Sequence, residues 1–187
     1  MSSRQRSLPG TTGKNTDWTI VSNVMRLFFS YRSQVAKGLT GVDVITPAAD
    51  MRKLVWSKEL QEIAQMWADQ CTPGHDKNRN TLTGGQVGQN VLAFKGLEPW
   101  DVTVSTMTEV VKYWYNEVTE VTAVNLAQDE PKFQFSGDTG HFTQLAWAPT
   151  DLLGCGWTQY VDPEEAHPFI SLLVCNYYTT GNSIITI

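Results

Sequence analysis

The chain has 187 residues, of which 41% are hydrophobic and 11% aromatic, with a formal net charge of −5 and a pI near 5.1. This length suits one domain built around one sizeable core. The acidic balance and the lack of a basic cluster make nucleic acid an unexpected partner. No apolar run approaches the roughly 18 to 20 residues that cross a bilayer, so no transmembrane segment is expected.

The first 17 residues differ in composition from the rest of the chain. They are rich in Ser, Thr, Gly, Arg and Lys and contain almost no apolar side chains, a composition that cannot offset the entropy lost on ordering. We therefore predict a flexible arm over residues 1–17 and a single domain over 18–187. The arm lacks the apolar stretch of a secretory signal, which leaves open whether a signal was trimmed or never existed.

Three segments have the apolar spacing of amphipathic helices. They cover residues 21–38, 57–71 and 103–118. The first ends at a glycine, the residue that most often terminates a helix. Ser57 is placed to cap the second helix, and Asp101 or Thr103 to cap the third.

The remaining segments predict loops and strands. A glycine-rich stretch over 83–88 leads into a turn or short helix at 89–92, and the polar segment 125–140 predicts a long loop. Short runs rich in β-branched and aromatic residues predict strands over 142–148, 155–161 and 169–177. Helices followed by an antiparallel sheet indicate an α+β layered domain.

Two histidines and one carboxylate are candidate metal ligands. His75 follows the second helix, His141 begins the first predicted strand, and Glu117 lies one turn after Trp114. Imidazole and carboxylate ligands suit a borderline cation such as zinc. The alternative is that these are unrelated polar residues with satisfied hydrogen bonds, and spacing alone favours that alternative.

Catalysis by a nucleophile is not expected. The sequence has no nucleophile elbow, no phosphate-binding loop and no HExxH motif. Cys71 lies in an apolar helical stripe, where burial would raise the pKa of its thiol and keep it unreactive.

The three cysteines divide into a pair and a leftover thiol. Cys155 and Cys175 fall in neighbouring predicted strands, so a cross-strand disulfide is geometrically reasonable. Its loop of about 20 residues would stabilise the fold by roughly 3 kcal/mol. Cys71 is then expected to be a small buried hydrophobic residue, with intermolecular pairing as the alternative.

Two segments resemble known family signatures. GHFTQLAW at 140–147, followed by GCG at 154–156, and VCNYYTTGN at 174–182 resemble the two signatures of the CAP superfamily. This superfamily groups cysteine-rich secretory proteins, antigen five and plant pathogenesis-related proteins. Segments upstream, at 54–60, 64–71, 74–76 and 87–91, resemble venom allergen-like proteins of the antigen-five type. The resemblance implies a three-layer α-β-α sandwich with a small antiparallel sheet.

The resemblance also implies a cleft lined by two histidines and two acidic residues. Carried over motif by motif, these positions are His75, Glu117 and His141, while the fourth falls on Gln89. Glutamine removes a negative charge and should weaken divalent metal binding. No cofactor is required, and a weakly bound zinc ion is the one that the cleft would admit. Asn78 stands where close relatives have the cysteine that pairs with the counterpart of Cys71.

The function implied by the resemblance is that of a secreted, extracellular, non-enzymatic lipid-binding protein. Sterols are expected near the loop between Glu117 and His141, and fatty acids or eicosanoids between helices. Phe133 and Phe135 in that loop are candidate lipid contacts, or else inward anchors. Two alternatives remain open: a metal-dependent hydrolase that activates water in the cleft, and a module that engages a host receptor without any lipid function.

Overall fold

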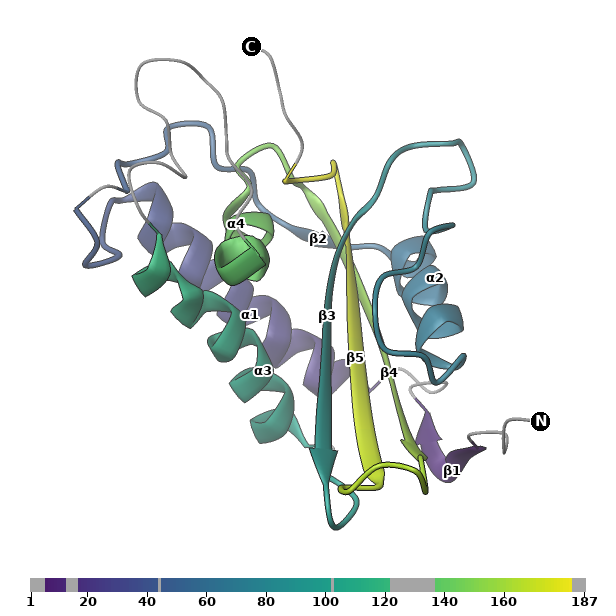
Figure 1. The fold of residues 1–187 in the computed structure, drawn as a ribbon. Coiled ribbons are helices and arrows are strands. Elements are labelled where there is room, and N and C mark those ends of the chain that lie inside the picture. Colours follow the sequence, from purple (N-terminus) through teal and green to yellow (C-terminus); the bar gives the residue numbers. More distant parts are fainter. Residues whose placement is uncertain (1–5, 13–16, 44, 102, 122–136, 183–187) are drawn as a thin grey trace.

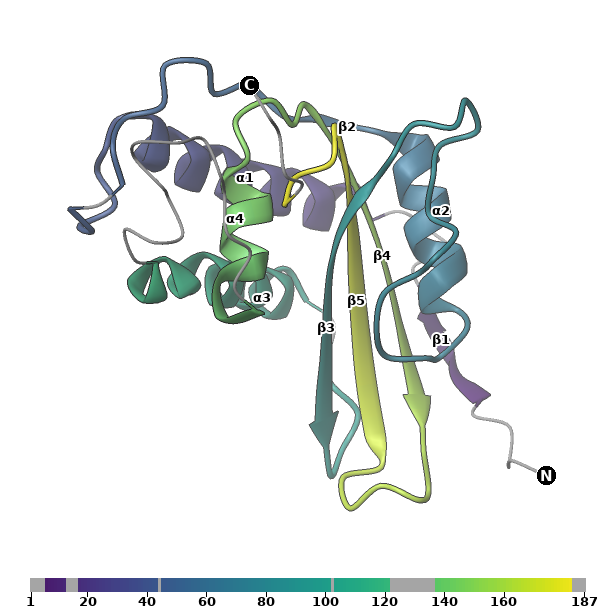
Figure 2. The same cartoon turned by 45° about the horizontal axis from the view of Figure 1, so that its top comes forward.

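The computed structural model describes residues 6–12, 17–43, 45–101, 103–121 and 137–182. Its helices are α1 (Trp18–Ala36), α2 (Lys58–Ala68), α3 (Val104–Asn116) and α4 (Gly140–Ala146), with short 3-10 helices η1 (Glu117–Glu120) and η2 (Gly137–Thr139). Its strands are β1 (Arg6–Thr12), β2 (Val55–Trp56), β3 (Gly88–Gly96), β4 (Leu152–Val161) and β5 (Phe169–Tyr178). Helices α1, α3 and α4 lie on one face of the sheet and α2 lies on the other (Figures 1 and 2). The expected three-layer α-β-α sandwich is confirmed.

The sheet is centred on β5. Its strand order is β1-β4-β5-β3, and the short β2 pairs in parallel with β4. The other pairings are antiparallel, with Cys155 opposite Cys175 in β4 and β5. Because successive side chains of a strand point to opposite faces, β5 contributes to two cores.

One core lies between the sheet and the α1, α3 and α4 layer. Phe28 and Trp114 have no exposed surface and pack there with Leu173 and Tyr177 of β5. A smaller core lies under α2, where Ala64, Ala68 and Cys71 pack with Leu172 and Val174. Burial on both faces explains why the third predicted strand is an almost continuous apolar run.

Helix α2 lies close to β4 because two glycines of that strand face it. A Cβ atom added at Gly154 would lie 2.2 Å from the backbone nitrogen of Gln61, and one at Gly156 would lie 2.4 Å from the Cα atom of Gln65. No side chain fits at either position. The Gly-Cys-Gly motif therefore puts two features on β4, close helix packing on one face and the disulfide on the other.

All three predicted helices are confirmed, together with two of their caps. The Ser57 hydroxyl accepts from the backbone nitrogen of Leu60, and Thr103 forms a capping box with Thr106. The predicted strands over 155–161 and 169–177 are confirmed as β4 and β5.

Three local predictions are wrong. Residues 89–92, expected in a turn or short helix, lie in β3, which pairs residue by residue with β5 from Gly88 to Gly96. Residues 142–148, expected as a strand, lie mostly in α4, so His141 is in a helix. In the expected N-terminal arm, residues 6–12 form β1 along the edge of β4. In each case pairing or packing with distant segments decides the conformation, which local propensity does not report.

The guanidinium of Arg32 ties α1 to the segments that follow α4 and precede β2. It donates to the backbone carbonyl oxygens of Leu145, Trp147, Ala148, Thr150 and Arg52 at 2.7 to 3.3 Å. Arg32 is only 3% exposed, and burial lowers its pKa to about 10, which still leaves it protonated at neutral pH. The last carbonyl groups of a helix have no partners within the helix, so this side chain satisfies the end of α4.

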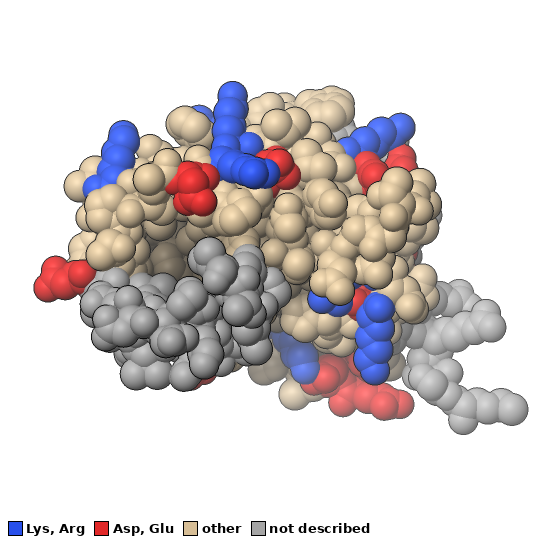
Figure 3. Space-filling model, turned by 90° about the horizontal axis from the view of Figure 1, so that it is seen from above, with Lys and Arg blue, Asp and Glu red and all other residues tan. Residues whose placement is uncertain are grey.

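No helix in the described ranges is long and apolar enough to cross a membrane. On the face seen from above, acidic and basic side chains lie next to one another (Figure 3). That face therefore presents no extended field of one sign that would attract a polyanion.

Replacing Arg32 is expected to destabilise the protein strongly. Arg32→Met removes the donor that the buried carbonyl groups of Leu145 and Thr150 and the carbonyl group of Arg52 have in Arg32, and we expect it to lower the free energy of unfolding by about 3 kcal/mol or more. Arg32→Lys keeps the charge but has fewer donors without the planar fork, so it should fall between wild type and Arg32→Met. Urea unfolding measures all three. Arg26→Lys, on the exposed side of the same helix, is the control and should change the value by less than about 0.5 kcal/mol.

Candidate functional site

Glu117 and His141 form a close pair where α3 meets α4. Glu117 is the C-cap of α3 and the first residue of η1, and His141 lies in the first turn of α4. One carboxylate oxygen of Glu117 lies 2.5 Å from Nδ1 of His141. The other accepts the backbone N–H groups of His141 and Phe142 at 2.9 and 3.0 Å. Thr139 gives α4 no side-chain capping bond, so Glu117 caps this helix and places a negative charge at its N-terminus.

The imidazole of His141 is enclosed by neighbouring groups. Its Nε2 lies 3.2 Å from the backbone carbonyl oxygen of Val91 in β3. The indole of Trp114 stacks on the ring with centroids 5.7 Å apart and planes 16° apart. Both ring nitrogens thus face oxygen acceptors, and neither directs a lone pair towards an open position. His141 would have to leave Glu117 or Val91 to bind a cation.

His75 pairs with Gln89 instead. The Oε1 atom of Gln89 accepts the backbone N–H of Asp76 at 2.9 Å, while Nε2 donates to Asn176 at 2.9 Å. This network fixes the amide orientation, because a backbone N–H can only donate. Nδ1 of His75, 3.2 Å from the same Oε1, is therefore the protonated nitrogen. Nε2 of His75 keeps its lone pair.

Burial is the main cause of a lowered pKa at His75. Desolvation disfavours the charged imidazolium, and the charges of Arg79 and His141 lower the pKa further, while the hydrogen bond to Gln89 opposes them. His75 is accordingly neutral at neutral pH. The two predicted histidines lie near one another, because His75 contacts Gln89 and His141 contacts Val91 two residues further along β3.

The four predicted cleft residues are brought together as two hydrogen-bonded couples. Within the described ranges, no group of three His, Cys, Asp or Glu side chains is arranged to hold a metal ion. Glu117 accepts hydrogen bonds from the N-terminus of α4 and pairs with His141. Gln89 is an uncharged amide at the position where the family resemblance predicts an acidic residue. In this arrangement His75, Glu117 and His141 are held in separate hydrogen bonds and are not grouped around a common point.

The cysteines follow the sequence prediction. Cys155 and Cys175 form a disulfide with a sequence separation of 20, and Cys71 is free and buried. Burial raises the pKa of the Cys71 thiol. Phe133 and Phe135, the candidate lipid contacts, lie outside the described residues.

An apolar pocket of about 200 Å³ lies between α1, α3 and the sheet. Its walls include Val21 and Val24 from α1 and Met107 and Val111 from α3, and its floor includes Leu173 and the Cys155–Cys175 disulfide. The family resemblance predicts a ligand between helices, but the apolar spacing of these helical positions does not by itself reveal a pocket. Periodicity identifies an apolar face, but it does not indicate whether the neighbouring element fills the space against it.

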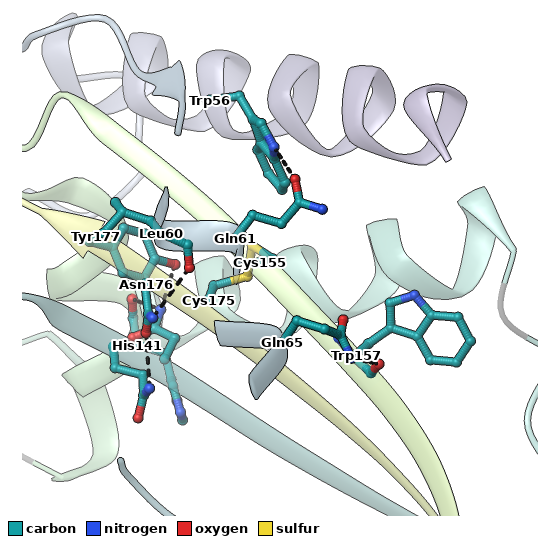
Figure 4. The surroundings of a disulfide bond; sticks show 12 residues. Trp56, Leu60, Gln61, Gln65, His141, Cys155, Trp157, Cys175, Asn176 and Tyr177 are labelled. Atoms are coloured by element: carbon teal, nitrogen blue, oxygen red, sulfur yellow. Dashed lines mark hydrogen bonds between the residues drawn. A yellow bond between two sulfur atoms is a disulfide. The ribbon is translucent and has the colours of Figure 1, made fainter. Parts of the chain in front are cut away.

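The polar residues around this pocket already have protein partners. Oε1 of Gln61 accepts from the indole nitrogen of Trp56 at 2.8 Å. Gln65 donates to the backbone oxygen of Trp157 at 2.9 Å and accepts from its backbone nitrogen at 3.1 Å. Figure 4 shows these side chains around the disulfide, with the Trp157 indole pointing away from it. These bonds leave an apolar chain as the best match for the lining.

The three-layer sandwich, with the Glu117–His141 pair at the start of α4, agrees with the comparison of this chain with known proteins. Residues 21–177 match the family model of the cysteine-rich secretory protein family, CAP. Venom allergen 5 of Microctonus hyperodae is 37% identical over 163 residues, covering 86% of this chain and 67% of that protein. Venom allergen 5 of Polistes fuscatus is 41% identical over 156 residues, covering 81% and 70%.

Solved structures agree with these sequence matches. BmVAL-1 aligns with a TM-score of 0.70 at 25% identity, over 96% of this chain and 84% of that chain. Venom allergen-like protein 4 of Schistosoma mansoni shares the fold with a TM-score of 0.61 at 23% identity, over 87% and 88%. The chain belongs to the CAP family, and its resemblance to venom allergen-like proteins is confirmed.

The lowered pKa of His75 predicts a dependence of stability on pH. The unfolded chain binds the proton more readily than the folded protein, so this contribution is present above the ordinary pKa of 6.5 and is lost as the pH falls below it. His75→Asn keeps an amide N–H near Gln89 and does not titrate. We expect the stability of wild type relative to His75→Asn to decrease between about pH 7.5 and about pH 5 in urea unfolding.

The imidazole can also be followed directly by NMR. Its titration midpoint should fall below 6.5. A titration midpoint of His75 above 6.5 would contradict the hydrogen bonds assigned to His75 and Gln89. A pH-independent difference in the free energy of unfolding between wild type and His75→Asn would contradict them as well.

Proposed function

We propose that this protein binds a single-chain lipid in the pocket between α1, α3 and the sheet. The mostly apolar lining of that pocket, in which Asp17, Gln61 and Gln65 are the polar members, is the observation that carries the proposal. Each methylene group moved from water into such a pocket contributes about 0.8 kcal/mol. Part of this gain offsets the loss of translational and rotational freedom on binding.

The dimensions of the pocket favour a linear chain. Its volume of about 200 Å³ is below the roughly 300 to 1,000 Å³ of sites for drug-sized ligands. A slim acyl chain fits such a space better than the fused rings of a sterol. Lipids with one straight hydrocarbon chain are therefore the preferred ligands in our proposal, and a sterol site near residues 125–140 draws no support from the described residues.

The head of the ligand would lie near Asp17. This residue is the exposed N-cap of α1 and lines the pocket, whereas Met107, which also lines it, is only 7% exposed. The open end is thus near Asp17 and the closed end near Met107. Among the residues that the structure describes, no Lys, Arg or His lines the pocket, so an uncharged head suits it better than a carboxylate does.

We further propose that the protein acts outside the cell. Disulfides such as Cys155–Cys175 persist mainly in oxidising compartments. The relatives named venom allergen 5 support the same proposal, because venom proteins are exported from the cells that make them.

Filling the pocket should abolish lipid binding. Val21 lines the pocket, whereas the neighbouring Ser22 is exposed on the outer side of α1. We expect Val21→Trp to weaken the binding of dodecanol by at least about tenfold, since a buried chain of several methylene groups loses its space. Ser22→Trp is the matched control and should bind like wild type. Calorimetry and native mass spectrometry measure binding, and melting curves verify the fold. Absence of binding by wild type, or equal binding by Val21→Trp, would refute the proposal.

Removing the charge of Asp17 should change which head group is preferred. Asparagine is as good an N-cap as aspartate, so Asp17→Asn keeps the cap that Asp17 makes to the backbone nitrogen of Thr19. We expect roughly two- to fivefold tighter binding of dodecanoate at low salt, with dodecanol unaffected. The gain should shrink as salt is added. Equal effects on both ligands would place the head elsewhere.

A further inference from the structure

A second, smaller pocket lies beside the lipid pocket on the same side of the sheet. It measures about 20 Å³ and lies between the first half of α3 and the ends of β3 and β5. Three of its residues, Met107, Trp157 and Leu173, also line the lipid pocket. The two spaces are therefore adjacent and share part of their lining.

The second pocket is lined almost entirely by apolar atoms. Val110 belongs to its wall, and Phe94 and Trp100 stack at its outer side with ring centroids 4.6 Å apart. Its volume is sufficient for about one water molecule, but a water in it would find few polar partners. A small apolar void of this kind suits the end of a hydrocarbon chain.

Met107 is the most adaptable part of this shared lining. Its side chain has three rotatable bonds and a polarisable sulfur, and such side chains readily change rotamer to fill irregular space. Trp157 is less free, since Gln65 holds its backbone through two hydrogen bonds at 2.9 and 3.1 Å. Among the three shared side chains, Met107 is therefore the one with the most conformational freedom.

We propose that Met107 separates the two pockets and thereby sets the longest chain the protein accommodates. The inference rests on the proposed lipid-binding function and adds a residue that determines specificity. A chain entering near Asp17 runs over the disulfide and ends against Met107. Shortening Met107 connects the lipid pocket with the space lined by Val110.

Chain length provides a direct measure of the usable space. Each methylene group that finds room tightens binding by about fourfold, and each one that finds none adds little. For a series of straight-chain alcohols, affinity should rise with length and then level off. The length at which it levels off measures the usable length of the pocket.

The experiment compares Met107→Ala with Val110→Ala. The first variant removes the partition, whereas the second enlarges the far pocket and leaves the partition in place, because Val110 lines only that pocket. Binding of alcohols of about 8 to 16 carbon atoms is measured for both variants, the double variant and wild type. We expect Met107→Ala to raise the chain length at which affinity levels off by about two to four carbons. The longest chain that then fits should bind at least about tenfold more tightly than it binds to wild type.

The other variants complete the test. Val110→Ala alone should keep the wild-type plateau, while the double variant should exceed Met107→Ala, because the far pocket becomes usable only when the partition is open. Met107→Phe keeps a large apolar side chain and provides a second test if Met107→Ala does not fold. In this variant, the chain length at which affinity levels off should be the same as in wild type or shorter. Melting curves confirm that each variant is folded.

Two outcomes would overturn the inference in distinguishable ways. If wild type binds alcohols and Val21→Trp does not, but Met107→Ala and wild type share the same plateau, the lipid pocket stands and the role of Met107 falls. An extension equally large for Val110→Ala and Met107→Ala has the same consequence, since the two spaces are then already joined. If no alcohol of any length binds wild type, the proposed function fails and the role of Met107 fails with it.

Discussion

The buried guanidinium of Arg32 is the interaction on which the arrangement around the cleft depends. It carries a positive charge in a site that is 3% exposed, and backbone carbonyl groups are its hydrogen-bond partners. These carbonyls belong to the end of α4 and the segment after it, and to Arg52 shortly before β2. One side chain of α1 therefore fixes the path of two segments that are remote from it in sequence, and an unpaired charge at this depth would be strongly destabilising.

The opposite end of α4 is fixed by another charge. Glu117 accepts two backbone N–H groups there and holds His141 at 2.5 Å. A helix of 7 residues is too short to persist alone in water, so α4 exists because a carboxylate binds its N-terminus and a guanidinium its C-terminus. The cleft couple of Glu117 and His141 is thus a consequence of how this helix is held.

This role changes the interpretation of the cleft. A carboxylate that caps a helix and pairs with an imidazole has little capacity left for a cation, and Gln89 adds no charge beside His75. The polar cleft residues hold α4 against α3 and β3. The apolar face between α1 and α3, in contrast, contains space that the side chains do not fill. That unfilled space is the basis of the proposed binding of a hydrocarbon chain, and the disulfide in its floor holds β4 and β5 together beneath it.

The sequence by itself determined the three long helices, two of their caps, the strands β4 and β5 and the pairing of Cys155 with Cys175. Each of these depends on periodicity, capping residues or local spacing, which are properties of a short window. Only the tertiary structure decided α4, β3 and β1, because their conformations depend on partners distant in sequence. Residues 142–148 have strand-forming composition, yet Glu117 and Arg32 hold most of them as a helix. The lipid pocket belongs to the same group, since an apolar helical stripe looks alike whether its neighbour fills the space or leaves it open.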